Sequence, residues 1–315
     1  MTSFFHAVSV FFHHLAAVHW GMLALAVACH MCKVASVSRA WRNVVAVAYP
    51  ESRVRWRTMY GGYLIGVGIN AIIPARAGDA VKLVVVKRRV EGATYPTLAA
   101  TLVLLNLFDM VVATVLILWA SVSGLLPNLH IIHRLRAFDI TWLFDHPRAT
   151  LTVLGLLAVA GLILTIWASR KVEEFKERVA LGFVALRDRD YYLRHVVPWQ
   201  AGDWLLRVVT IYFFLRAFSI PATAKNALLV QVTQGLSTIF PFSPSGIGTA
   251  QALIVYVFRD VASRTSILAF SVGMQITLIS VNVVLGFIAM GIMLRSFNWR
   301  RQVEAKAAES ETVEV

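Results

Sequence analysis

Long stretches without a charged side chain are the feature of this sequence that most restricts its fold. Residues 153–168 and 111–120 contain no Asp, Glu, Lys or Arg, and each lies within a longer apolar segment. A helix needs about 20 mostly apolar residues to cross a bilayer. The whole chain is 58% hydrophobic and only 15% charged, with a mean hydropathy of +0.69. The sequence therefore predicts an all-α integral membrane protein.

Two kinds of apolar segment are present. Five segments predict full spans, namely 15–32, 97–120, 149–168, 197–217 and 266–294. Two further apolar regions, 58–90 and 226–258, are each interrupted by Pro and Gly. The short arms on either side of these breaks predict re-entrant hairpins of two half-helices. Two full crossings in each region would leave the chain ends on the same sides, so this alternative stays open.

The distribution of Lys and Arg predicts the orientation. Basic residues gather in the segments 33–57, 87–89, 170–194 and 295–306. We expect a multi-pass protein of the cell (inner or plasma) membrane. Because cytoplasmic loops carry the excess of Lys and Arg, we expect its N-terminus outside and its C-terminus in the cytoplasm. The two hairpins then enter from opposite sides, as in an inverted repeat. The segment 170–195 has helical apolar spacing and predicts an amphipathic helix on the cytoplasmic surface.

The same pattern predicts the domain organisation. We expect one multi-pass membrane domain over residues 1–302 and a short disordered cytoplasmic tail over 303–315, because the tail lacks apolar periodicity.

The first hairpin breaks at the run NAIIPARAGDAVK, which places Arg76, Asp79 and Lys82 at membrane depth. Each such residue costs roughly 2.5–3.5 kcal/mol on insertion scales. Pro74 would end one half-helix, and the next would begin near 75–77 with free N–H groups that favour an anion. Arg76 and Lys82 would contact a phosphate, while Asp79 would pair with either cation, cap the helix or contact a cationic part of a substrate. The alternative is a self-neutralised network that only fixes the hairpin.

The second hairpin breaks at FPFSPSGIGTAQ, where Pro241 and Pro244 end one arm. A glycine-rich break before a helix can hold a phosphate or carboxylate through backbone N–H groups. The candidate substrate contacts here are Ser245, Gly246, Gly248 and Gln251. A tight helix crossing through small residues explains the same pattern equally well.

Other polar residues lie within apolar helices. Asp203 and Arg207 are four residues apart, which indicates a structural ion pair on one helix face. Gln234 lies one turn from Gln231, and either side chain would line a polar path or hydrogen-bond a neighbouring helix.

Several function classes lack support in the sequence. No nucleophile, base and acid with recognisable spacing occur together, and no Walker or dinucleotide-binding loop is present, so we expect neither an enzyme nor a cofactor. Cys29 and Cys32 share a helix face without a second ligand pair, so no metal site is expected. The net charge of +13 is explained by topology and anionic lipids. No recognition motif accompanies it, so nucleic acid is not an expected partner.

The run GYLIGVGINAIIPARAGDAVKLVVVKRR, together with FSPSGIGTAQALIVY, resembles the lysylphosphatidylglycerol synthase transmembrane (flippase-like) family over roughly residues 30–295. The family pattern N-x-x-x-P-x-R-x-G-acid-x-x-basic is matched by Asn70, Pro74, Arg76, Gly78, Asp79 and Lys82. Asp109 matches the aspartate of a family helix that usually reads E-R-x-x-D, although Leu105 and Asn106 stand at its first two positions. Ser245 replaces a glycine of P-G-G-x-G. Gln251 stands where glutamate is common, so an ion-coupled cycle that relies on a carboxylate there is not supported.

The resemblance implies movement of lipids or polyprenyl-phosphate-linked head groups across the membrane. Asp109 would then be a gating carboxylate or one that orients other site residues, with Gln234 in a similar role. We expect the chain to lack the cytosolic aminoacyl-transferase domain of some family members. We therefore predict a lipid translocase-like transporter whose partners are anionic membrane lipids. The alternative is a membrane subunit or scaffold of a lipid or glycolipid biosynthesis enzyme, which would then be its partner.

Overall fold

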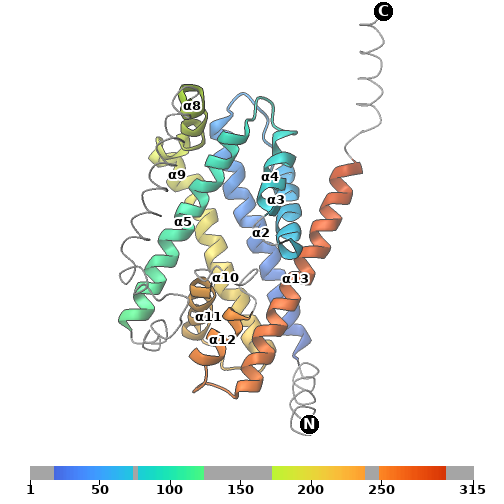
Figure 1. Cartoon of the computed structure of the whole chain (residues 1–315), viewed down its shortest axis with the longest axis vertical. Coiled ribbons are helices and arrows are strands. Elements are labelled where there is room, and N and C mark those ends of the chain that lie inside the picture. The colour runs from blue at the N-terminus through green and yellow to red at the C-terminus, as the bar shows by residue number, and fades with distance from the viewer. Residues whose placement is uncertain (1–17, 74–76, 124–171, 238–247, 296–315) are drawn as a thin grey trace, which may run out of the picture.

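The protein is described by a computed structural model over residues 18–73, 77–123, 172–237 and 248–295. Within these ranges the regular structure is helical and no strand occurs, as the sequence predicted. The helices form an elongated bundle (Figure 1). The elements are α2 (Trp20–Ala48), α3 (Trp56–Ile72), α4 (Ala77–Lys87), α5 (Tyr95–Val122), α8 (Val172–Gly182), η3 (Val184–Leu186), α9 (Arg189–His195), α10 (Val197–Ala217), α11 (Ala224–Ser237), α12 (Thr249–Val257) and α13 (Arg264–Arg295).

Three described helices, α2, α5 and α13, are long and apolar enough to cross a membrane. They correspond to the predicted spans 15–32, 97–120 and 266–294. α10 has the bounds predicted for its segment, 197–217. The remaining predicted span, 149–168, lies outside the described residues.

The helix α2 is much longer than the first predicted span, because it continues through the basic segment to Ala48. The predicted end of this span at residue 32 was wrong, and the reason is packing. Trp41 is fully buried, and its indole N–H donates to the Thr101 hydroxyl of α5 at 3.0 Å. The Asn43 side-chain amide donates to the His195 carbonyl at the end of α9. Partners on other helices therefore keep the basic segment helical.

Two pairs of short helices lie toward opposite ends of the bundle (Figure 1). In each pair the helices pack on one another, α3 on α4 and α11 on α12. α3 ends at Ile72, just before Pro74, and α4 begins at Ala77, within the predicted start. α11 ends at Ser237 and α12 begins at Thr249. At a rise of 1.5 Å per residue, α4 and α12 are about 17 and 14 Å long, roughly half of the ~30 Å hydrocarbon core.

Glycines allow α3 to approach both of its neighbours closely. A Cβ on Gly78 of α4 would lie 1.9 Å from the Gly66 carbonyl oxygen of α3. A Cβ on Gly68 would lie 2.8 Å from the Cα of Gly286 in α13. Residues two apart point to different sides of a helix, so α3 is held between α4 on one side and α13 on the other.

The predicted amphipathic segment is divided into α8, η3 and α9, which lie at the same end of the bundle as the α3–α4 pair (Figure 1). Asp188 caps α9 by accepting a hydrogen bond from the Tyr191 N–H at 3.0 Å. The Tyr191 hydroxyl donates to the Asn43 carbonyl of α2 at 3.1 Å. Burial raises the pKa of Tyr191 above the usual tyrosine value, so the hydroxyl keeps its proton, and this tie to α2, at alkaline as well as neutral pH.

Candidate functional site

A polar layer separates two apolar clusters along α5 and α10. On α5, Leu105 belongs to the cluster that includes the ends of α2 and α4, and Ala120 belongs to the cluster around α11 to α13. At the start of α10, its N-cap residue Val196 belongs to the first of these clusters, and Ile211 of α10 belongs to the second. The residues between them on α10 include Gln200, Asp203 and Arg207. Buried ionisable groups concentrated in one layer are a candidate functional site rather than ordinary core.

The first part of this layer comes from α3 and α4 and is built from the predicted motif. The Asn70 side-chain oxygen accepts from the Gly78 N–H at 2.7 Å, and its Nδ2 donates to Asp79 Oδ1 at 3.1 Å. Lys82 Nζ lies 2.8 Å from the same Asp79 oxygen and 4.1 Å from the ring centroid of Tyr63. The structure thus brings together four of the residues predicted for the first motif. Asp79 pairs with Lys82, one of the pairings that the sequence predicted.

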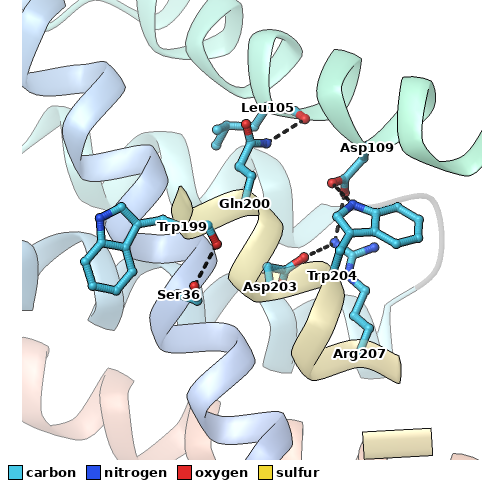
Figure 2. Close-up of polar contacts among 8 residues, drawn as sticks. All are labelled: Ser36, Leu105, Asp109, Trp199, Gln200, Asp203, Trp204 and Arg207. Atoms are coloured by element: carbon cyan, nitrogen blue, oxygen red, sulfur yellow. Dashed lines mark hydrogen bonds and ion pairs between the residues drawn. The ribbon is translucent and has the colours of Figure 1, made fainter. Parts of the chain in front are cut away.

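The second part joins α5 to α10 through a shared arginine (Figure 2). Arg207 Nη2 lies 2.9 Å from Asp109 Oδ2 and 2.6 Å from Asp203 Oδ2. The Trp204 indole N–H donates to Asp109 Oδ1 at 2.8 Å, and the Arg207 guanidinium carbon lies 4.8 Å from the Trp204 ring centroid. The predicted Asp203–Arg207 ion pair is confirmed. Its link to Asp109 was not predicted.

Several buried polar atoms of α10 have no hydrogen-bond partner in the described part of the chain. Gln200 donates its amide N–H to the Leu105 carbonyl at 3.1 Å, as Figure 2 shows. Within the described contacts, the atoms left without a partner are Gln200 Oε1, Asp203 Oδ1, Arg207 Nε and Thr210 Oγ1. Each unsatisfied buried group costs about 1–3 kcal/mol. Such a concentration on one helix is typical of a site that receives a proton, water or ligand.

A cavity of about 40 Å³ connects the two parts of the layer. Its described lining is Val37, Tyr63, Asp79, Lys82, Leu102, Leu105, Asn106, Asp109 and Gln200. A water molecule needs roughly 10–15 Å³ of such space, whereas ligand pockets measure about 300–1,000 Å³. The cavity can therefore hold water but not a lipid head group, so the conformation described here is a closed one.

The residues predicted in the second hairpin do not reach this cavity in the described part of the chain. Gln251 Oε1 accepts from the Gly248 N–H at 2.6 Å, and its Nε2 donates to Gln275 Oε1 of α13. Gln251 thus caps α12 and ties it to α13. Gln234 is half-buried on α11 and is absent from the described cavity lining. The predicted site residues Arg76, Ser245 and Gly246 lie outside the described residues.

Sequence reasoning missed the part of the layer that α10 contributes, although a signal was present. Gln200, Asp203, Trp204 and Arg207 belong to the network, but none was predicted as a site residue. These four residues stand at i, i+3, i+4 and i+7, which is the spacing of one helix face. Polar and indole groups at this spacing inside an otherwise apolar span indicate a helix face directed at a polar interior.

The comparisons with known proteins agree with the membrane character of these helices. A family model described as the Lysylphosphatidylglycerol synthase TM region matches residues 4–301. The matched range contains both helix pairs and the whole polar layer. No curated protein matches the chain, and no solved structure does either.

Proposed function

This chain belongs to the lysylphosphatidylglycerol synthase TM region family, and from that membership and its polar layer we propose a lipid translocase-like transporter. It binds the anionic head group of a phospholipid or of a polyprenyl-phosphate-linked lipid and moves it across the membrane. The observation that carries the proposal is the cavity between α4, α5 and α10, which Asp79, Lys82 and Asp109 line, with Arg207 hydrogen-bonded to Asp109 at 2.9 Å.

The cations of the layer have the chemistry that a phosphate needs. Arg207 presents a planar fork of donors, and Lys82 presents a compact ammonium with three. In the closed conformation Asp109 forms an ion pair with Arg207, and Asp79 forms one with Lys82. A head-group phosphate would replace these carboxylates as the partner of each cation. The carboxylates therefore keep the buried cations compensated while no substrate is bound.

The two pairs of short helices support a transport cycle. α4 and α12 are too short to cross the hydrocarbon core, so we propose that both pairs are re-entrant hairpins. The pairs lie toward opposite ends of the bundle (Figure 1). This is the arrangement of inverted repeats that open a central site alternately to each side. Because the cavity is too small for a head group, entry requires α4 to move relative to α5 and α10. The close contact between Gly66 and Gly78 would make α3 move together with α4.

The orientation follows from the basic residues at one end. Arg53, Arg55 and Arg57 precede or begin α3, and Arg88 and Arg89 follow α4. This end also carries α8 and α9 (Figure 1). By the excess of basic residues it faces the cytoplasm, with the N-terminus outside and the C-terminus inside.

A second candidate function is a membrane subunit or scaffold of a lipid-biosynthesis enzyme. The observation that favours it is the direct pairing of Lys82 with Asp79 and of Arg207 with Asp109 and Asp203, which would also serve a purely structural network. In either case we propose a chain without catalytic activity of its own, since no nucleophile or acid–base set was found in its sequence.

Lipid retention separates the two candidates. The purified full chain is exchanged into mixed micelles with equal phosphatidylglycerol and phosphatidylcholine, and the lipids that remain bound are measured by native mass spectrometry. We expect the wild type to retain phosphatidylglycerol selectively. Lys82→Met should reduce this retention roughly 10-fold or more, because a charge-assisted hydrogen bond contributes about 1.5–3 kcal/mol.

The matched control is Arg259→Met, which removes an exposed cation in the turn after α12. It should retain phosphatidylglycerol as the wild type does. Equal retention of both lipids by the wild type would contradict the transporter and favour the scaffold.

A further inference from the structure

Six ionisable side chains interact across the polar layer, and within the described residues their charges balance. The cations are Lys33, Lys82 and Arg207, and the carboxylates are Asp79, Asp109 and Asp203. Besides the ion pairs already given, Lys33 of α2 interacts electrostatically with Asp109, Asp203, Arg207 and Lys82. Among the described residues, three positive and three negative side chains leave this partly buried layer without net charge.

A balanced layer resists the entry of an anion alone. A head-group phosphate would add one negative charge to a desolvated site, and an uncompensated buried charge is costly. Entry becomes favourable when one carboxylate loses its charge, because one cation is then left for the phosphate. A proton taken up by one carboxylate removes its negative charge, and no cation has to move.

Asp203 is the fully buried carboxylate of the described layer, and it has a vacant position for that proton. Asp109 uses both oxygens, one for the Trp204 indole and one for Arg207. Asp79 is one-third exposed, so its charge is partly solvated. Asp203 is 1% exposed, its Oδ2 faces Arg207, and among the described residues its Oδ1 has no partner. Once protonated, Asp203 keeps Oδ2 against Arg207 while Oδ1–H becomes a donor.

Water beside the same helix face can supply that proton. Gln200, three residues before Asp203, is 2% exposed and lines the cavity, and among the described residues its Oε1 also has no partner. Its amide is directed toward Leu105 of α5 (Figure 2). The cavity has room for water and reaches within one helical turn of Asp203, which makes it a source of the proton.

The helices packed against α10 supply the other groups that act on Asp203. α10 itself contributes Arg207, α2 contributes Lys33 and α5 contributes Asp109. α3 contributes the Tyr63 hydroxyl, and through the cavity α4 contributes Asp79 and Lys82.

The remaining described helices that contact α10 add little charge near this point. α9 ends in Arg194 and His195 on its exposed side, and α11 has only Lys225 at its start. α13 carries ionisable residues only at Arg264 and Arg295, its two ends.

We propose that Asp203 takes up one proton together with the anionic head group, so that head-group binding is proton-coupled. The inference rests on the proposed function and adds its coupling ion. With Asp203 neutral, the described layer carries one positive charge, which the phosphate compensates. Lower pH favours the protonated layer and tightens anion binding, and higher pH weakens it.

The test is the pH dependence of phosphatidylglycerol binding to the purified full chain in phosphatidylcholine nanodiscs. A phosphodiester is the right probe because a phosphomonoester has its own second pKa near 6. We expect the affinity of the wild type to rise about tenfold for each unit of pH decrease, over the range in which Asp203 binds its proton, because one proton is taken up per head group.

Three variants locate the proton. Asp203→Asn should bind phosphatidylglycerol independently of pH, with the affinity that the wild type reaches at low pH. The exposed-carboxylate control Asp190→Asn, on α9, should keep the pH dependence. Asp109→Asn also removes one negative charge from the layer, so it should bind phosphatidylglycerol at high pH more tightly than the wild type does. A pH dependence that persists in Asp203→Asn would overturn the assignment to Asp203.

The wild-type titration decides the proposal even if a variant does not fold. Selective binding of phosphatidylglycerol with no pH dependence would overturn proton coupling and leave the proposed function intact. The absence of any preference for phosphatidylglycerol at every pH would overturn the proposed function and the coupling with it.

Discussion

The two pairs of short helices, α3–α4 and α11–α12, have the same layout but different chemistry. At the start of α4, the carboxylate of Asp79 and the ammonium of Lys82 meet the amide of Asn70. At the start of α12, two neutral amides, Gln251 and Gln275, meet instead. Among the described residues of the two pairs, only those of α3–α4 line the cavity between α4, α5 and α10 with charge. The comparison indicates that α3–α4 carries the anion chemistry, while α11–α12 is held by interactions that need no counter-ion.

The largest expected effect comes from the glycine contact that joins α3 to α4. Gly78→Ala places a methyl group against the Gly66 carbonyl oxygen, and a backbone atom cannot yield as a flexible side chain does. We expect a loss at or above the upper end of the about 1–3 kcal/mol that overpacking costs. Thermal unfolding in detergent, followed by tryptophan fluorescence, measures it.

The control for this change is Gly291→Ala in α13, where an added Cβ meets nothing within 4 Å. It should leave the unfolding temperature unchanged or raise it slightly, since Ala favours a helix over Gly. Equal effects of the two substitutions would show that the α3–α4 contact is looser than the structure describes.

An intermediate effect is expected from breaking the charged network. Lys82→Met leaves Asp79 with Asn70 as its described side-chain partner, and we expect a loss of about 2 kcal/mol, below the 3–5 kcal/mol of a fully buried pair because Asp79 is one-third exposed. The double variant Asp79→Asn, Lys82→Met should lose less than the sum of the single changes. Unfolding temperatures of the four proteins in this cycle measure the coupling, and additive losses would contradict it.

The smallest effect is expected in the uncharged pair. Gln251→Leu leaves the Gly248 N–H and the Gln275 side-chain oxygen without the partners described for them, and we expect a loss of about 1 kcal/mol. Gln251→Glu should restore the cap at Gly248 and thus separate the capping role from the link to Gln275. A loss in Gln251→Leu as large as that in Lys82→Met would remove the distinction between the two helix pairs.

Much of the helix arrangement could be predicted because apolar length and Pro–Gly breaks are local signals. The bounds of α10 and the start of α4 follow directly from them. The end of α2 could not be predicted, because what keeps residues 33–48 helical is burial of Trp41 against α5 and contacts from Asn43 to α9. Those partners are distant in sequence, and a run of basic residues alone gives no sign of them.

The candidate site divides in the same way. The Asp79–Lys82 pair lies within one helical turn, so spacing included it among the interactions predicted for Asp79. The link between Asp109 and Arg207 joins α5 to α10 and depends on how those helices pack. Spacing could place Arg207 and Asp203 on one face but could not say which helix that face would meet.

The many neighbours of α2 have a practical consequence for measuring motion. α2 contacts α3, α5, α8, η3 and α10 along its length, and His30 near its middle hydrogen-bonds Asn282 of α13 at 2.8 Å. A helix held from so many sides is a suitable reference frame. Distances from a spin label on α2 to labels on α4 and on α12 would therefore record the displacement of each helix pair separately, in one coordinate system.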